Sequence, residues 1–415
     1  MMIEKYGCSI AAEFAKDISS PFFYNLLLAI SVSLAVCLLN VATERWHGRY
    51  SMDLDTRGIQ KVHKKSVPRT GGLALLAGVL AVVFYGNFEE GSAFAGHETR
   101  AAMIKLLVAA TPAFLSGVVE DLTKRVSPKV RLYAILASAG LAVGLLAAPL
   151  PRIDVWGLDS VMSVVPVAIA VTVIAVAGVT NSINIVDGFN GVAGFSIVII
   201  LSGMGFIAWQ AGDILIIQLA AAAIGATIGF LMLNYPTGRL FMGDGGAYFL
   251  GFWAAEIGVL TVVRNPGVNA WQVMAIYSYP VIEVLFSIYR RKILFNARAA
   301  APDRLHLHSL FYRRFAKHRI SGKKHPWTCN AGVACFIATW IGVATTCSIL
   351  FGNTIPAAFA LVLIQAVLYI AVYMRLVRGH WGHCRNLAVF FGLRPQPRNR
   401  PMNGNDLVTS PRAFG

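Results

Sequence analysis

Charged residues are scarce in this chain. Only 13% of its 415 residues are Asp, Glu, Lys or Arg, whereas about a quarter is usual in a soluble globular protein. Hydrophobic residues make up 56% of the sequence, more than folding in water requires. The composition argues against a water-soluble domain and indicates that the chain folds in a lipid bilayer.

Cysteine is scarce as well, and its spacing excludes two common kinds of site. No CxxC pair occurs, and no histidine stands at zinc-site spacing from a cysteine. A zinc site is therefore not expected, and we assign the cysteines no chemistry. Internal repeats and low-complexity segments are also missing, so one domain is predicted. The six cysteines are Cys8, Cys37, Cys329, Cys335, Cys347 and Cys384.

Eleven apolar stretches are long enough to be read as membrane spans. About twenty apolar residues cross a bilayer, and a single span in lipid must be a helix to satisfy its own backbone. The first stretch is too long for a signal-peptide core and has no small-residue cleavage site after it, so we expect it to remain. The predicted fold is an all-α polytopic membrane protein with about eleven transmembrane helices. They are expected near residues 21–42, 70–86, 102–119, 132–149, 160–180, 192–209, 214–233, 246–263, 268–289, 329–350 and 354–374.

Lysine and arginine gather on alternate connections between these stretches. Thirty of the 36 lie on one set of connections, which the positive-inside rule assigns to the cytoplasm. This predicts an external N-terminus and a cytoplasmic C-terminus, and it explains the formal charge of +16 without a nucleic-acid partner. The expected parts are an external segment (1–20), a membrane domain (21–374) and a basic cytoplasmic tail (375–415).

The predicted cytoplasmic connections also contain most of the residues that could perform chemistry. The first carries Lys61, His63 and Arg69 before the pair Gly71–Gly72. Adjacent glycines allow backbone N–H groups to approach an anion, which favours a phosphate site. A basic segment touching anionic headgroups is the alternative.

The second connection places two carboxylates, Glu120 and Asp121, before Lys124 and Lys129. Neighbouring acids repel each other unless a cation relieves them. Magnesium suits such a place, because it takes one or two carboxylates and completes its shell with phosphates and water. A solvated helix end with local ion pairs is the other interpretation.

The third connection has a row of polar residues, Asn181, Asn184 and Asp187, at a spacing close to one helix face. A turn is the alternative, since Asn and Gly favour turns. In the fourth, Asp244 follows Phe241 and stands among three glycines. It is predicted either as a metal carboxylate or as the N-cap of the next helix.

The fifth connection contains Arg304, His306 and His308 in a basic stretch. Two histidines at this spacing could donate to a pyrophosphate, with the arginine as a bidentate partner. Zinc is not indicated, because no third ligand has suitable spacing.

These five segments, in this order, resemble the polyprenyl-phosphate N-acetylhexosamine-1-phosphate transferases of glycosyltransferase family 4. That superfamily includes undecaprenyl-phosphate N-acetylglucosamine-1-phosphate transferases and the phospho-N-acetylmuramoyl-pentapeptide transferase. The similarity runs from about residue 55 to residue 314. Glu120 and Asn190 each stand where relatives commonly have Asp. The order His-Leu-His-Ser at His306, in place of three successive histidines, points to the simple N-acetylhexosamine branch.

The resemblance implies transfer of N-acetylhexosamine 1-phosphate from a UDP-sugar to undecaprenyl phosphate, releasing UMP and initiating a cell-surface glycan such as O-antigen or lipopolysaccharide. It implies Mg²⁺ as cofactor, with Mn²⁺ as a substitute, and a multi-pass protein of the bacterial inner membrane with its active site on the cytoplasmic face. The implied partners are the UDP-sugar, undecaprenyl phosphate and membrane lipids, and a homodimer is compatible with it.

By position in the motifs, the resemblance assigns three kinds of role. The metal ligands are Asp121, Asp244 and Glu120. The catalytic set is Glu120, Asp121, Asp187, Asp244, His306 and His308. The substrate-binding set is Lys61, His63, Arg69, Lys124, Lys129, Asn181, Asn184, Asn190, Phe241 and Arg304.

Two other functions compete with this interpretation. The pentapeptide transferase is the alternative within the superfamily. A secondary transporter is the alternative from another class, because Glu256 and Glu283 lie inside predicted spans and acids within a membrane are functional by default. Glu283, however, is close to the cytoplasmic end and matches a family acid position, whereas Glu256 has no assigned role.

Overall fold

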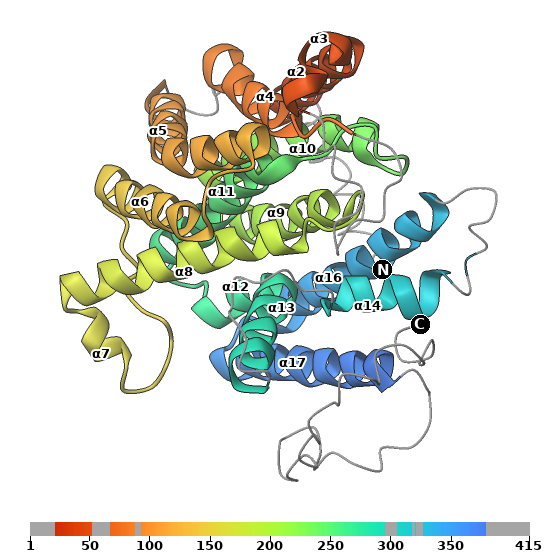
Figure 1. Cartoon of the computed structure of the whole chain (residues 1–415). Coiled ribbons are helices and arrows are strands. Elements are labelled where there is room, and N and C mark those ends of the chain that lie inside the picture. The colour runs from red at the N-terminus through yellow and green to blue at the C-terminus, as the bar shows by residue number, and fades with distance from the viewer. Residues whose placement is uncertain are drawn as a thin grey trace, which may run out of the picture.

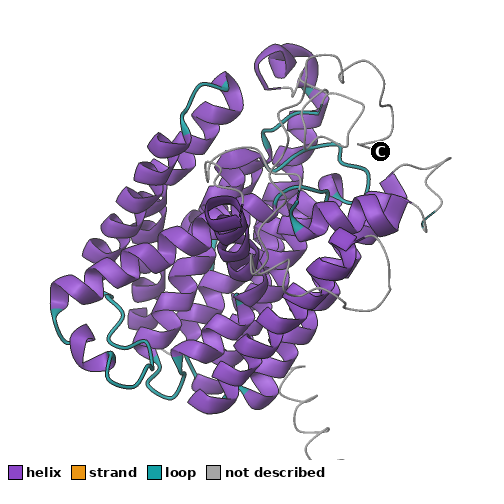
Figure 2. Ribbon diagram, turned by 60° about the horizontal axis from the view of Figure 1, so that its bottom comes forward, coloured by secondary structure: helices purple, strands orange, loops and turns teal. Residues whose placement is uncertain are grey.

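The computed structural model describes residues 21–51, 67–87, 93–294, 305–317, 320 and 327–378. Within these ranges the chain forms helices joined by short connections, and no β-strand occurs (Figure 2). The described connections gather at the two ends of the bundle, as expected where backbone outside a helix must avoid hydrocarbon. The helices are α2 (Pro21–Ala42), α3 (Glu44–Ser51), α4 (Gly71–Tyr85), α5 (Ala93–Thr123), α6 (Pro128–Leu146), α7 (Asp159–Met162), α8 (Val165–Val186), α9 (Val192–Ala211), α10 (Ile214–Asn234), α11 (Gly243–Arg264), α12 (Ala270–Ile276), α13 (Ser278–Tyr289), α14 (Leu307–Phe311), α16 (Trp327–Phe351) and α17 (Ile355–Arg378), with π-helical turns η1 (Arg290–Leu294) and η2 (Tyr312–Ala316).

The predicted all-helical, polytopic fold is confirmed. Nine of the described helices are long and apolar enough to cross a membrane, and the bent pair α12–α13 makes up to ten. The short apolar helix α4 occupies the second predicted span. The predicted segments 1–20 and most of 375–415 lie outside the described residues.

Three predicted boundaries are corrected by the structure. Helix α5 has 31 residues and is much longer than the predicted span 102–119. Helix α8 begins after a separate short helix, α7, and continues to Val186, so Asn181 and Asn184 are helical residues and not part of a connection. The predicted span 268–289 is broken between α12 and α13 by a bend of 80°.

A proline explains the break between α12 and α13. Pro280 has no N–H to donate to the carbonyl of Ile276, and its ring would collide with that carbonyl in a continuous helix. The apolar run hides this break, because proline is common in membrane helices. The bend is supported by side chains: the Tyr277 hydroxyl donates to Ala254 O at 2.6 Å, and Gln365 Nε2 donates to Ala275 O at 3.1 Å.

Helix α11 is the centre of the bundle (Figure 1). Its most apolar window is 94% buried, whereas those of α2 and α17 are 22% and 17% buried. It packs against α5, α8, α4 and α9. Because the first turn of α11 carries Asp244, this acid is supplied by the most deeply buried of the described membrane-spanning helices.

Glycines allow α4 and α5 to approach the beginning of α11. A Cβ added to Gly72 would lie 2.5 Å from the backbone nitrogen of Gly246, and one added to Gly117 would lie 2.5 Å from the carbonyl carbon of Asp244. Small residues serve this purpose in membrane proteins, where close backbone contact supports helix association. Gly71–Gly72, which the sequence associates with an anion site, therefore has a packing role.

Candidate active site

Two predicted acids meet where α5 ends and α11 begins. Asp121, in the last turn of α5, accepts a hydrogen bond from Gly245 N at 3.0 Å through Oδ2. Gly243 has a φ of 75°, and a Cβ at that position would overlap the Asp121 carboxylate. The start of α11 thus lies directly against Asp121, with Asp244 beside it. Asp244 is not the N-cap: α11 begins at Gly243, after Met242.

Cations surround this acid pair. Arg131, in the first turn of α6, forms a short ion pair with Asp244 Oδ2. Arg69 Nη1 and Lys124 Nζ lie 3.9 and 4.0 Å from Asp121 Oδ1. Two carboxylates and three cations from different segments therefore share one end of the bundle, an arrangement suited to a ligand with several phosphates.

Backbone pairing brings Arg69 to this place. Phe241 N donates to Pro68 O at 2.9 Å, and Gly71 N donates back to Phe241 O at 3.0 Å. The first and fourth predicted segments therefore run side by side. Phe241 lies in this pairing, half-buried, immediately before Met242 and the start of α11.

The third predicted segment adds an amide and another acid. Asn184 Nδ2 donates to Asp244 Oδ1 at 3.3 Å. Asp187 caps the C-terminus of α8. Surrounding protein atoms and the nearby charge of Asp244 raise the pKa of Asp187 to about 7, against the opposing effect of Arg69. The site therefore favours a bound cation, which would let all three acids stay ionised. Asn181 lies on α8 one turn before Asn184 and is half-buried.

The two histidines approach the same region from α14. The His306 and His308 rings are stacked with centroids 5.4 Å apart and an interplanar angle of 8°. A Cβ on Gly188 would lie 2.9 Å from His308 Nε2, and Phe189 meets the His308 ring edge-on at 5.7 Å. The histidine segment thus contacts the residues that directly follow Asp187.

The donor atoms fit Mg²⁺ bound by two carboxylates. Asp121 Oδ1 is buried and accepts no hydrogen bond from any residue that the structure describes. Such an orphaned oxygen beside Asp244 suits a hard cation that takes the rest of its shell from phosphate and water.

The third predicted metal ligand does not join this pair. Within the described ranges, no group of three His, Cys, Asp or Glu side chains is placed to hold one metal ion. Glu120 Oε2 instead accepts a hydrogen bond from Val126 N at 2.8 Å and braces the connection between α5 and α6. Successive residues of a helix point about 100° apart, so Asp121 faces α11 while Glu120 turns toward Val126 and remains near Arg131.

Other predicted residues are placed in different settings. Asn190 is buried and donates to Pro236 O at 3.1 Å, which ties two connections together. Asn234 supports the same junction by accepting from Gly191 N and donating to Leu240 O. Lys129 is exposed in the first turn of α6. Lys61, His63 and Arg304 lie outside the described residues.

Arg131 is a site residue that sequence reasoning missed. The positive-inside rule already explained its charge. No catalytic or binding role was therefore assigned to it, although it lies in the first turn of an otherwise apolar helix. Tyr248, one turn after Asp244 in α11, lies beside the same guanidinium and was also missed. No sequence spacing indicates either contact, because α6 and α11 are far apart in the chain.

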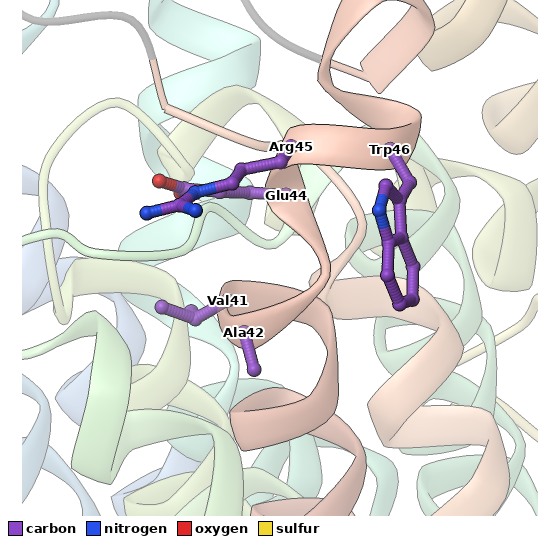
Figure 3. A pocket seen from close by; sticks show the side chains of 5 residues that line it. All are labelled: Val41, Ala42, Glu44, Arg45 and Trp46. Atoms are coloured by element: carbon purple, nitrogen blue, oxygen red, sulfur yellow. The ribbon is translucent and has the colours of Figure 1, made fainter.

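A separate surface hollow lies at the junction of α2 and α3 (Figure 3). Val41, Ala42, Glu44, Arg45 and Trp46 line it, and none of them belongs to the predicted site. Trp46 is 84% exposed. This hollow is distinct from the residues that gather around Asp121 and Asp244.

Comparison with known proteins agrees with this architecture. The family model for glycosyl transferase family 4 matches residues 103–262, which include Asp121, Asp187 and Asp244. A probable undecaprenyl-phosphate N-acetylglucosaminyl 1-phosphate transferase of Bacillus subtilis is 30% identical over 272 residues, covering 65% of this chain and 72% of the relative. A decaprenyl-phosphate N-acetylglucosaminephosphotransferase of Mycobacterium leprae is 28% identical over 310 residues, covering 68% and 72%.

A match to another branch is shorter. A phospho-N-acetylmuramoyl-pentapeptide-transferase of Streptococcus pneumoniae is 30% identical over 154 residues, covering 36% of this chain and 44% of the relative. Together with these relatives, the fold identifies a polytopic membrane enzyme of the transferase class. The chain belongs to glycosyl transferase family 4.

Proposed function

We propose that this enzyme transfers N-acetylhexosamine 1-phosphate from a UDP-sugar to undecaprenyl phosphate. One observation carries the proposal: Asp121 and Asp244, from separate helices, meet among Arg69, Lys124 and Arg131. The names of the Bacillus and Mycobacterium relatives support a polyprenyl-phosphate acceptor and an N-acetylglucosamine donor. The longer match to these relatives favours this branch over the pentapeptide transferase.

The chemistry is a displacement at the β-phosphorus of the donor. An oxygen of the lipid phosphate forms a bond to that phosphorus, and the bond from it to the oxygen bridging to the α-phosphorus breaks, so that UMP leaves. A phosphate monoester has a second pKa of about 6 and is mostly dianionic at neutral pH, so the nucleophile needs little help from a base. The main task is to hold three phosphates together despite their repulsion.

The residues around the acid pair suit this task. Arg69, Lys124 and Arg131 supply positive charge at the phosphates, and Asn184 with Asp187 orients the nucleotide or the lipid phosphate. Asp121 and Asp244 would hold Mg²⁺, which supplies charge neutralisation at the diphosphate. His308, which contacts Gly188 and Phe189, acts as a phosphate contact next to the Asp187 segment.

We further propose that the site faces the cytoplasm of a bacterium, at the inner membrane. The connections at this end belong to the set that carries 30 of the 36 lysines and arginines. The product would then be a lipid-diphospho-sugar that starts a cell-surface glycan such as O-antigen.

The direct test is transfer by the purified protein. Radiolabelled UDP-N-acetylglucosamine, undecaprenyl phosphate and Mg²⁺ are expected to yield labelled lipid together with UMP, and EDTA is expected to stop the reaction. A panel of other UDP-sugars identifies the sugar. Absence of both products with every UDP-sugar in the panel would overturn the proposal.

Arg131→Gln is expected to slow transfer about tenfold to a hundredfold, because a hydrogen bond to a charged group contributes about 1.5–3 kcal/mol. Glutamine keeps a polar side chain but removes the charge that faces Asp244. Initial rates of lipid labelling measure the effect. Arg125→Gln, which removes an exposed charge from the same connection, is the control and should keep the wild-type rate. Equal rates for Arg131→Gln and wild type would contradict the assigned role.

A further inference from the structure

The segment that carries the histidines is held by α13 and η1 from two sides. Glu283, a fully buried residue of α13, accepts from Leu307 N at 3.1 Å through Oε2. Arg290, the first residue of η1, donates to Leu305 O at 2.9 Å and to the Tyr373 hydroxyl of α17 at 2.6 Å. The backbone just before and after His306 is therefore anchored to α13 and η1, which follow the break at Pro280.

Glu283 also contacts the imidazole of His306 directly. Its Oε1 lies 2.9 Å from His306 Nδ1. A carboxylate only accepts hydrogen bonds, so the proton of the neutral ring belongs on Nδ1 and leaves Nε2 as an acceptor. A partner of this kind sets the tautomer and the ring plane of a histidine.

The ring of His308 is stacked on the ring of His306. The two rings lie parallel, and both are nearly completely buried, which leaves little room for either ring to turn. His308 in turn contacts Gly188 and Phe189, which follow Asp187. A continuous line of contacts thus leads from Glu283 to the acid cluster.

We propose that Glu283 is a positioning residue, which fixes the tautomer of His306 and through it the orientation of His308 toward the Asp187–Gly188 segment. The proposal rests on the proposed function, because its kinetic test requires sugar-phosphate transfer. Glu283 lies in a predicted membrane span, where a buried acid is costly unless it is paired. The paired histidine and backbone N–H explain why this acid is tolerated there.

Glu283→Gln separates positioning from packing. Glutamine has the same shape, and its amide oxygen can still accept from Leu307 N, but its NH₂ group would donate to His306 Nδ1 and reverse the tautomer. We expect kcat to fall about tenfold to a hundredfold, as when a hydrogen-bonded supporting partner is removed from a functional histidine. KM for the UDP-sugar should stay within about twofold, because the contacts that bind the substrate and the transition state equally well are unchanged.

Glu256→Gln is the matched control. Glu256 is also a buried acid in a membrane helix, 2% exposed, on α11. Its replacement removes a carboxylate from the same kind of environment without touching the histidine segment. This variant is expected to keep the wild-type kcat and KM.

A double-mutant cycle tests whether Glu283 acts through His306. If it does, Glu283→Gln adds no further loss of kcat to His306→Ala. Wild-type kcat in Glu283→Gln, or losses that multiply in the double variant, would overturn the proposal. Failure of the wild-type protein to transfer any sugar would instead count against the proposed function.

A measurement on the unmutated protein does not depend on how the variant folds. In ¹⁵N-histidine NMR, the signal that disappears in His306→Ala is expected to show protonated Nδ1 and unprotonated Nε2. The opposite tautomer in the wild-type protein would overturn the assignment.

Discussion

Asp244→Asn is expected to lower the rate of sugar-phosphate transfer about a thousandfold, because metal-assisted charge stabilisation contributes several kcal/mol and each 1.36 kcal/mol is tenfold in rate. The asparagine keeps the size and can keep the contact with Asn184, but it removes the charge that pairs with Arg131 and would hold the cation. The measurement is incorporation of label into lipid, with thermal unfolding in detergent as the check on folding.

Asp213→Asn is the matched control for this experiment. Asp213 is also an aspartate paired with an arginine, Arg264, at 2.8 Å, but it caps α10 at the opposite end of the bundle. The control should keep its rate within about twofold, because the partners of Asp213 are Ile216, Arg264 and Asn265, which lie at the other end of the bundle from Asp244. More than a tenth of wild-type activity in Asp244→Asn would contradict the role assigned to this acid.

Gly117→Ala is expected to damage both stability and activity. The added methyl group would press on the backbone at Asp244 and Gly245, which cannot move aside as a flexible side chain could. Such overpacking costs about 1–3 kcal/mol of stability. It would also push the start of α11 away from Asp121, and a shift of about 1 Å at a catalytic site can cost a hundredfold in rate.

Gly144→Ala supplies the comparison. Nothing lies within 4 Å of a Cβ at Gly144 in α6, so the same substitution should leave rate and unfolding temperature unchanged or slightly improved. Unfolding can be followed through the buried thiols of Cys37 and Cys329. If Gly117→Ala matched Gly144→Ala in both measurements, the close crossing of α5 and α11 would not be required.

Much of the membrane architecture was predictable, because each span is a local property of the chain. A run such as 192–209 must be helical in lipid whatever surrounds it, and α9 and α10 occupy the predicted positions with small shifts. Asp121 and Asp244 could be singled out for a related reason: acids are rare in such a chain, and only a function explains them beside apolar spans.

Other features depended on contacts that a sequence pattern does not contain. Whether Glu120 joins the metal site depends on the direction of its side chain. That side chain turns to Val126 N, while Asp121 faces α11. The spacing of Asn181 and Asn184 indicated one helix face, which α8 confirms, but it did not indicate that Asn184 would meet Asp244. The bend at Pro280 had a local signal, but the apolar run around it gave the stronger prediction of a straight span.

By itself the sequence determined that the protein is a helical membrane protein with polar groups at the helix ends, since hydrophobicity and the obligation to hydrogen-bond the backbone act residue by residue. Only the tertiary structure decided which groups meet. Arg131 of α6 meets Asp244 of α11, and Glu283 of α13 meets His306, only because the helices pack together in space. Those partnerships arise from packing between distant segments, where distance in space is independent of distance along the chain.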